Sequence, residues 1–292
     1  MEFQLSKYQS DHYSQSGEDG VIQEILLRIS SKIGLDKWCV EFGAWDGVYL
    51  SNTCNLIRNN GYSAVLIEGD KTRAKQLRLN YPQQNVHCIC KFINFEGDNT
   101  LEKVLSTTPI PKDFDFLSID IDGADYYIFE GLVEYQPKIV CIEFNPTIPN
   151  VVDFVQPKEF SIKQGSSARA ISRLAIKKGY RLVATTNVNL IFVRDDLIFA
   201  IGDNLPNLED LNVQGNDPQY VFMGYDGTVL SNKVGLSSWH GVDFPITEVQ
   251  FLPKYLRRFV GDYGIIRKIV YALFLLLKDP KLFLTEWKRR FT

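Results

Sequence analysis

Two short segments of this chain combine glycines and carboxylates in a spacing that suits the binding of a nucleoside. The segment from Trp38 to Gly47 (WCVEFGAWDG) reads as a buried strand that runs into a tight loop with glycines at Gly43 and Gly47. Glycine allows a sharp turn and a close approach to a ligand, because it has no Cβ. A second apolar run, Ser63 to Ile67, ends at Glu68. An acid about 20 residues beyond a glycine loop, at the tip of the neighbouring strand, is where α/β folds hold ribose hydroxyls. The pattern predicts a nucleoside-bearing cofactor.

The spacing of the glycines favours one kind of cofactor over another. A loop that binds pyrophosphate needs G-x-G-x-x-G, so that amide groups at a helix start face the phosphates. Here three residues separate Gly43 from Gly47, and the carboxylates of Glu41 and Asp46 lie beside them. Two carboxylates would repel a dinucleotide but suit the sulfonium and ammonium groups of S-adenosylmethionine. The alternative for the loop alone is an ordinary turn with a solvated acid, which the presence of Glu68 at the expected distance disfavours.

A second set of polar side chains follows the strands predicted at 116–119 and 139–142. Ligands of open α/β sheets bind outside the carboxyl ends of the strands, so these side chains should converge near the reactive end of the cofactor. The candidate catalytic residues are Asp120, Asp122, Glu143 and Asn145. They can act as a general base on an acceptor hydroxyl. Alternatively, Asp120, Asp122 and Glu143 can hold Mg²⁺ through oxygen ligands, and the metal would then orient the acceptor and lower the pKa of its hydroxyl.

Ordinary structural roles are the alternative for each of these residues. Asp122, with Asp125 three residues later, can cap the helix that begins at Ala124. Asn145 precedes Pro146, and the two form a common turn pair. Acids and an amide on adjacent strand tips are harder to explain together in this way.

Strands and helices alternate along the part of the chain that carries these residues. Helices are predicted at 17–29, 52–60, 72–80, 100–105, 124–132 and 167–178, and strands at 39–42, 64–67, 86–91, 116–119, 139–142, 180–184 and 190–193. Strand-then-helix units with short connections predict a parallel, doubly wound sheet with right-handed crossovers. The last two strands are too close in sequence for a helical crossover, so they should be antiparallel. The predicted fold is α/β, Rossmann-like and of the class I methyltransferase form, mostly parallel with a terminal antiparallel strand, plus a C-terminal extension.

We expect three parts along the chain. Residues 1–202 form the S-adenosylmethionine-binding domain, residues 203–253 a β-rich extension or lid, and residues 254–292 a basic, apolar helical tail. In the second part, Tyr220–Met223 and Thr228–Leu230 predict a hairpin. The extension either decorates the sheet or forms a platform for the acceptor over the strand tips.

Composition excludes some classes of protein and indicates the cellular compartment of this one. Of the 292 residues, 45% are hydrophobic and 23% charged, which is typical of a soluble globular protein. The net charge of −3 is not a nucleic-acid signature, so no nucleic-acid partner is expected. The five cysteines are typical of reduced core residues, and the polar start lacks the core of a signal peptide. These features favour a cytoplasmic protein.

An ordered set of motifs from about residue 13 to 195 resembles the FkbM-type S-adenosylmethionine-dependent methyltransferases. The motifs are YSQSGED at 13–19, VEFGAWDG at 40–47, LSNT at 50–53, IEGD at 67–70, SIDIDGAD at 118–125, GSS at 165–167 and NLIFV at 189–193. That family is similar to sugar and polyketide O-methyltransferases, and many of its members lie with polysaccharide biosynthesis.

The resemblance implies roles for individual residues around the cofactor. Glu41, Gly43 and Gly47 would border the methionine part, and Glu68 would hold the ribose. The other candidates are Ser14 and Gln15, which would help to close the site, Asn94 and Phe95, which would lie near the adenine, and Asp46, Asn52 and Asp120. The family does not fix one catalytic base, so the choice of Asp120 or Asp122 rests on the residues themselves.

The C-terminal tail differs in charge from the rest of the chain. Residues 254–292 carry ten Lys/Arg and three Asp/Glu, a net charge of +7, which leaves −10 on residues 1–253. The apolar run Ile269–Leu277 is too short to cross a bilayer, which needs about 20 residues. With basic residues on both sides, it favours a segment (264–292) that lies on the inner, anionic face of a membrane. The alternative is a helix docked on the domain or on a second subunit.

Together these features predict an S-adenosylmethionine-dependent O-methyltransferase. Its acceptor would be a hydroxyl of a saccharide or glycan precursor. A lipid-linked precursor is one form that this acceptor could take. Two alternatives are a catalytically silent, membrane-associated scaffold with the same fold and a nucleotide-dependent oxidoreductase, which the missing G-x-G-x-x-G disfavours.

Overall fold

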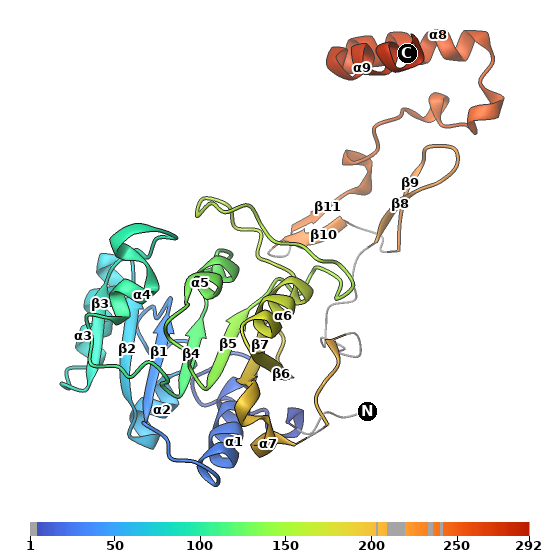
Figure 1. Ribbon diagram of the computed structural model, residues 1–292. Helices are drawn as coiled ribbons and strands as arrows, with labels where there is room; N and C mark the ends of the chain where they lie inside the picture. The colour runs from blue at the N-terminus through green and yellow to red at the C-terminus, as the bar shows by residue number, and fades with distance from the viewer. Residues whose placement is uncertain (1–4, 203, 209–219, 233–235, 240–241, 292) are drawn as a thin grey trace. The chain divides into compact units, whose positions relative to one another are not determined.

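The chain forms two compact units, residues 1–216 and 217–292, in a computed structural model (Figure 1). The residues described are 5–202, 204–208, 220–232, 236–239 and 242–291. Each unit is described by itself below. The three-part division expected from the sequence remains a prediction.

A seven-stranded sheet forms the centre of the first unit, with the order β3-β2-β1-β4-β5-β7-β6. The strands are β1 (Trp38–Phe42), β2 (Ser63–Glu68), β3 (Val86–Cys90), β4 (Phe116–Ile119), β5 (Ile139–Glu143), β6 (Tyr180–Thr185) and β7 (Asn189–Arg194). The pairs among β1 to β5 are parallel, and β7 runs antiparallel to both β5 and β6. The predicted α/β fold is confirmed, and the antiparallel strand β7, the last of these seven in sequence, is inserted between β5 and β6.

Helices cover both faces of this sheet. They are α1 (Glu18–Ser30), α2 (Cys54–Asn60), α3 (Lys71–Asn80), α4 (Leu101–Leu105), α5 (Asp125–Gly131), α6 (Ala168–Lys177) and α7 (Ile198–Ile201). Side chains alternate across β2, as the strand period of two requires. Ala64 and Leu66 belong to the core under α1, α2, α3 and α7, whereas Val65 and Ile67 belong to the core under α4, α5 and α6. The packing of helices on both faces of the sheet holds the central strands, and with them the positions of the strand ends.

The second unit contains short strands and two helices. The strands are β8 (Val221–Met223), β9 (Val229–Ser231), β10 (Leu236–Trp239) and β11 (Val242–Phe244), and the helices are α8 (Ile265–Lys278) and α9 (Pro280–Phe291). β8 and β9 pair antiparallel, which confirms the predicted hairpin, and its role as a lid or platform stays a prediction. Among the described residues, none of the helices combines the length and the apolar character needed to cross a membrane.

Candidate active site

A cleft of about 700 Å³ opens where the central strands of the first unit end. Its wall includes Phe42 from β1, Glu68 from β2 and Glu143 from β5. Seven residues predicted from the sequence lie on this wall: Gln15, Gly43, Glu68, Asn94, Asp120, Asp122 and Glu143. The cleft is therefore at the edge of the sheet where α/β folds bind their ligands.

Gly43 allows the loop after β1 to pass directly against the end of β4. Its φ is +85°, and a Cβ at this position would lie 1.8 Å from the carbonyl oxygen of Asp120. No real Cβ approaches an oxygen so closely, so only glycine fits here without displacing the backbone. The close approach fixes the start of the segment that carries the acids of the cleft.

Glu41 is buried under the loop and does not reach the cleft. One of its carboxylate oxygens accepts hydrogen bonds from the hydroxyls of Ser51 (2.6 Å) and Thr53 (2.7 Å), and the other accepts one from the backbone N–H of Asn52 (2.8 Å). Burial raises the pKa of Glu41 to about 7, although these hydrogen bonds oppose the rise. Glu41 thus holds the segment 51–53 against β1.

The raised pKa of Glu41 predicts a pH dependence of stability. A carboxyl group with a higher pKa in the folded chain stabilises it only while protonated, so this contribution is complete below about pH 4.5 and is lost as the pH rises through 7. The shift corresponds to about 3 kcal/mol. Between acidic and mildly alkaline pH, urea unfolding should therefore show a larger loss of stability for the wild type than for Glu41→Gln.

Glu130→Gln is the matched control for this prediction, because Glu130 is exposed at the end of α5. It should leave the pH dependence of the unfolding free energy as in the wild type. Parallel curves for the wild type and Glu41→Gln would contradict the assignment of the shift to Glu41.

Glu68 lies at the end of β2 with its side chain on the wall of the cleft. One carboxylate oxygen accepts the backbone N–H of Trp45 (2.9 Å), and the other accepts the N–H of Asp70 (2.7 Å). Each oxygen of an ionised carboxylate has a second acceptor position. Glu68 therefore connects the glycine loop to the start of α3 and keeps acceptor capacity for hydroxyl groups in the cleft.

Two buried acids at the start of α1 hold the segment that brings Gln15 to the cleft. Asp19 accepts hydrogen bonds from the backbone N–H groups of residues 12–14, at 2.7 to 2.9 Å. Glu18 accepts from the Thr186 hydroxyl (2.5 Å) and from the side-chain amide of Asn189 (3.0 Å). The sequence motif at 13–19 contains both acids, yet only their position after folding shows this role.

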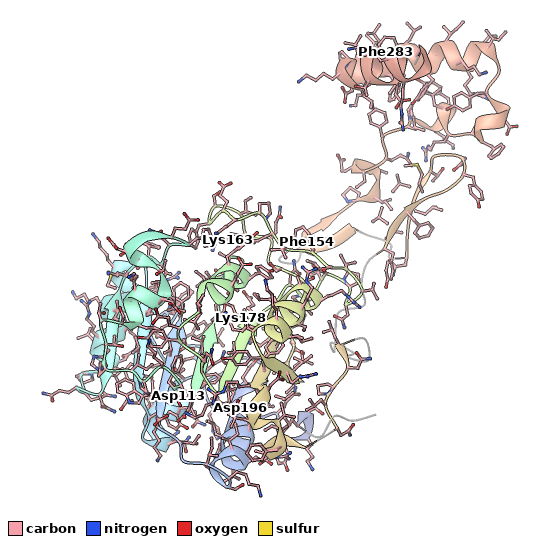
Figure 2. All side chains as sticks on the ribbon, viewed as in Figure 1. Asp113, Phe154, Lys163, Lys178, Asp196 and Phe283 are labelled. Atoms are coloured by element: carbon pink, nitrogen blue, oxygen red, sulfur yellow. The ribbon has the colours of Figure 1, made fainter. Side chains whose placement is uncertain are left out.

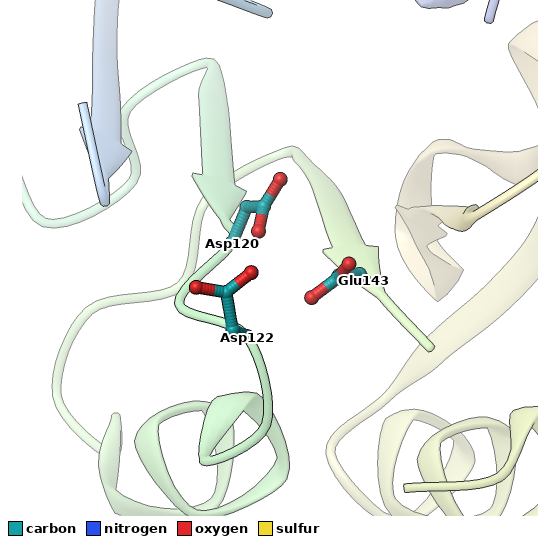
Figure 3. Close-up of side chains that lie close together, drawn as sticks. All are labelled: Asp120, Asp122 and Glu143. Carbon is teal, nitrogen blue, oxygen red and sulfur yellow. The ribbon is translucent and has the colours of Figure 1, made fainter. Parts of the chain in front are cut away.

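Asp120, Asp122 and Glu143 bring their carboxyl groups together at the end of β4 and β5 (Figure 3). One oxygen from each lies within 4.8 Å of the others. Burial and the charge of Asp120 raise the pKa of Glu143 to about 9, and burial and the charge of Asp122 raise the pKa of Asp120. A side-chain interaction between Glu143 and Asp120 adds to the rise in the pKa of Glu143 and opposes the rise in that of Asp120. The cluster can therefore accept a proton or bind a cation.

Asp125 shapes the loop between Asp120 and α5. Its carboxylate accepts the backbone N–H groups of Ile121 (2.9 Å) and Gly123 (2.8 Å). No side chain caps the start of α5 at Ala124, so the structure does not show the capping role considered for Asp122. Asp122 is exposed and has a φ of +58°. Its conformation is strained for a residue other than glycine, and such strain is concentrated at functional sites.

The other seven predicted residues are not among those that line the cleft: Ser14, Glu41, Asp46, Gly47, Asn52, Phe95 and Asn145. Asp46 accepts the backbone N–H groups of Val48 and Tyr49, and the carbonyl of Gly47 accepts the Tyr81 hydroxyl (2.6 Å). These contacts order the loop.

Contacts of the other residues in this group also organise the surroundings of the cleft. The Asn52 amide donates to the hydroxyl of Ser118 on β4 (3.0 Å). Phe95 stacks on Phe160, with 4.0 Å between ring centroids, and Phe160 is on the wall. Asn145 accepts from Thr147 and donates to the Gln164 carbonyl, as a turn residue does.

The sequence did not single out the aromatic and basic residues at the mouth of the cleft. Trp45, Tyr49 and Leu50 lie on the wall and are 44%, 61% and 41% exposed. Arg73 covers the Trp45 ring, with 3.4 Å from its guanidinium carbon to the ring centroid. Lys163, on the segment between β5 and α6 (Figure 2), donates to the Ile121 carbonyl (2.8 Å). Trp45 lies inside the glycine motif at 40–47, and Tyr49 and Leu50 follow it directly, which was the available signal for these three.

Comparison with known proteins supports a methyltransferase. Residues 98–182 match the family described as the methyltransferase FkbM domain. The match confirms the predicted resemblance over this stretch, which contains Asp120, Asp122 and Glu143, and it supports transfer of a methyl group from S-adenosylmethionine. No protein in a search of curated sequences matched the chain.

Several solved structures are similar to the chain at low identity. An S-adenosylmethionine-dependent methyltransferase from Aquifex aeolicus is 12% identical, with a TM-score of 0.38, over 65% of this chain and 95% of its own. The mitomycin 7-O-methyltransferase MmcR is 14% identical, with a TM-score of 0.34, over 60% of this chain and 54% of its own.

Proposed function

We propose that this chain, which carries a methyltransferase domain of the FkbM type, methylates a hydroxyl group of a saccharide or glycan precursor with S-adenosylmethionine as donor. The observation that carries the proposal is the pairing of Glu68 with the acid cluster Asp120, Asp122 and Glu143 on the wall of one cleft. The first can hold a ribose and the second can take a proton from an acceptor.

The residues that line the cleft fit the cofactor in charge and hydrogen-bonding capacity. Gly43 lets the loop after β1 pack against the end of β4, and Glu68 offers acceptor positions for ribose hydroxyls. Asn94 lies on the same wall after β3, where the adenine is expected. When bound, S-adenosylmethionine supplies an electrophilic methyl group on its sulfonium. The acids around the cleft complement that positive charge.

The acid cluster would serve as the general base. Asp120 would accept the proton of the acceptor hydroxyl as its oxygen takes up the methyl group that the bound cofactor would supply. Glu143, protonated and hydrogen-bonded to Asp120, stabilises the carboxylate before the proton moves. Positioning of the oxygen in line with the methyl carbon supplies much of the rate.

Magnesium is the alternative use of the same three carboxylates. Oxygen donors of this kind fit a hard divalent cation, and Asp120, Asp122 and Glu143 would hold it. Bound Mg²⁺ would lower the pKa of the acceptor hydroxyl. Loss of methyl transfer on chelation, with recovery on addition of Mg²⁺, would favour this alternative, whereas full activity in chelator would favour the base.

Replacement of Glu68 by alanine should weaken the binding of S-adenosylhomocysteine by roughly ten- to hundredfold, because hydrogen bonds to a charged carboxylate are lost. The measurement is calorimetric titration, with circular dichroism to verify the fold. Since Glu68 also holds Trp45 and Asp70, Asp70→Asn serves as a comparison that keeps Glu68 in place. Equal affinity of Glu68→Ala and the wild type would remove Glu68 from the site.

The acceptor class is tested by transfer of a labelled methyl group to soluble and lipid-linked saccharides. Methyl ethers identified on sugar hydroxyls would support the proposal. Labelling of amines or of protein side chains, with none on saccharides, would contradict it while leaving the methyltransferase assignment intact.

A further inference from the structure

The inner face of α8 is held by other residues of the second unit. Leu275 is only 2% exposed. The ring of Phe274 packs edge-on against Phe251 at 5.3 Å between centroids, and Tyr271 packs against Tyr263 at 6.2 Å. These contacts fix which side of the helix faces away from its own unit.

The opposite face of α8 presents aliphatic side chains to solvent. The exposed residues and fractions are Ile265 (79%), Ile266 (80%), Ile269 (55%), Leu273 (54%), Leu276 (44%) and Leu277 (85%). At about 100° per residue, all of them fall within an arc of about 120°. They form one continuous stripe, which we call the outer face of α8. An exposed apolar patch of this kind marks an interaction site.

One basic residue lies beside this outer face. Lys268 projects about 60° beyond one edge of the stripe, whereas Lys278, in the last position of α8, lies about 160° from the centre of the stripe, by the same helical period. Both lysines are exposed, as is Lys281 at the start of α9. The segment 254–292 carries a net charge of +7. Its electrostatic partner is therefore anionic.

We propose that the outer face of α8 lies in the interface of an anionic lipid bilayer, with Lys268 at the phosphate groups. Aliphatic residues on one face and basic residues beside it are the features of an interfacial helix. A second copy of this chain fits less well, because two segments of charge +7 would repel each other. The inference goes beyond the proposed methyl transfer and does not depend on it.

Co-sedimentation of the full chain with vesicles tests the proposal. The chain should bind vesicles of phosphatidylcholine and phosphatidylglycerol in equal parts, bind phosphatidylcholine alone much more weakly, and be released by salt. Leu277→Ser should lower the partition coefficient about tenfold. Lys268→Gln should lower it about fivefold, the effect of one basic charge near an anionic surface.

Leu79→Ser is the matched control, because Leu79 is equally apolar and 66% exposed on α3 of the first unit. It should bind vesicles as the wild type does. Equal sedimentation of Leu277→Ser and the wild type would overturn the proposal. So would a wild type that binds no vesicles but forms a dimer that Leu277→Ser dissociates. Titration with S-adenosylhomocysteine should be unchanged by Leu277→Ser, which separates this test from that of the proposed function.

Discussion

Asp120→Asn is expected to lower the rate of methyl transfer at saturating cofactor by roughly a hundred- to ten-thousand-fold, the contribution of a positioned general base. An amide cannot accept the proton from the acceptor hydroxyl. Binding of S-adenosylhomocysteine should be retained, because the glycine loop and Glu68 are unchanged. Removal of the negative charge should also lower the pKa of Glu143, which that charge helps to raise to about 9. Single-turnover kinetics with a labelled donor measure the chemical step.

Asp113→Asn is the matched control for this variant. Asp113 is exposed and precedes β4, whereas Asp120 follows it, so the two acids lie at opposite ends of the same strand. The rate should stay at the wild-type value in Asp113→Asn. A rate in Asp120→Asn within a few-fold of the wild type would assign the base to another residue.

Gly43→Ala is expected to destabilise the chain by about 2–5 kcal/mol and to abolish binding of S-adenosylhomocysteine. The added Cβ would meet the carbonyl oxygen of Asp120 at 1.8 Å, at a φ of +85° that alanine disfavours. Relief of the clash requires movement of the loop after β1 or of the end of β4. Urea unfolding measures the loss of stability, and calorimetry measures binding in the variant that remains folded.

Gly131→Ala is the comparison for the stability measurement. Gly131 ends α5, and a Cβ there would meet nothing within 4 Å. Its unfolding free energy should be unchanged or higher by up to about 1 kcal/mol. A Gly43→Ala variant with wild-type stability and affinity would show that the loop adapts and that the close approach is not required.

The sequence predicted the sheet well because its strands carry a local signal. Each is a short apolar run, and the helices between them end at recognisable positions such as Gly61, which has a φ of +70° as the C-cap of α2. The position of β7 between β5 and β6 carries no such signal, since it depends on pairing between distant segments. Prediction from one sequence therefore yields the elements more readily than their order.

The candidate site was predictable in part. Glu68, Asp120, Asp122 and Glu143 each end or follow a strand, so the topology alone brings them to one edge. Glu41 also lies on a strand near this edge, but its carboxylate turns inward to the segment 51–53, a contact set by side-chain packing. The aromatic residues at the mouth lie in loops. The hydrophobic periodicity that identifies helices and strands does not predict the conformation of a loop.

Calorimetric titration of the wild-type chain with S-adenosylhomocysteine, and separately with NAD, tests the central claim most directly. The account predicts one saturable site for S-adenosylhomocysteine and no binding of NAD, because acids rather than a pyrophosphate loop line the cleft. Absence of binding by a folded chain would contradict a methyl donor site and favour the silent scaffold. Saturable binding of NAD would favour the oxidoreductase.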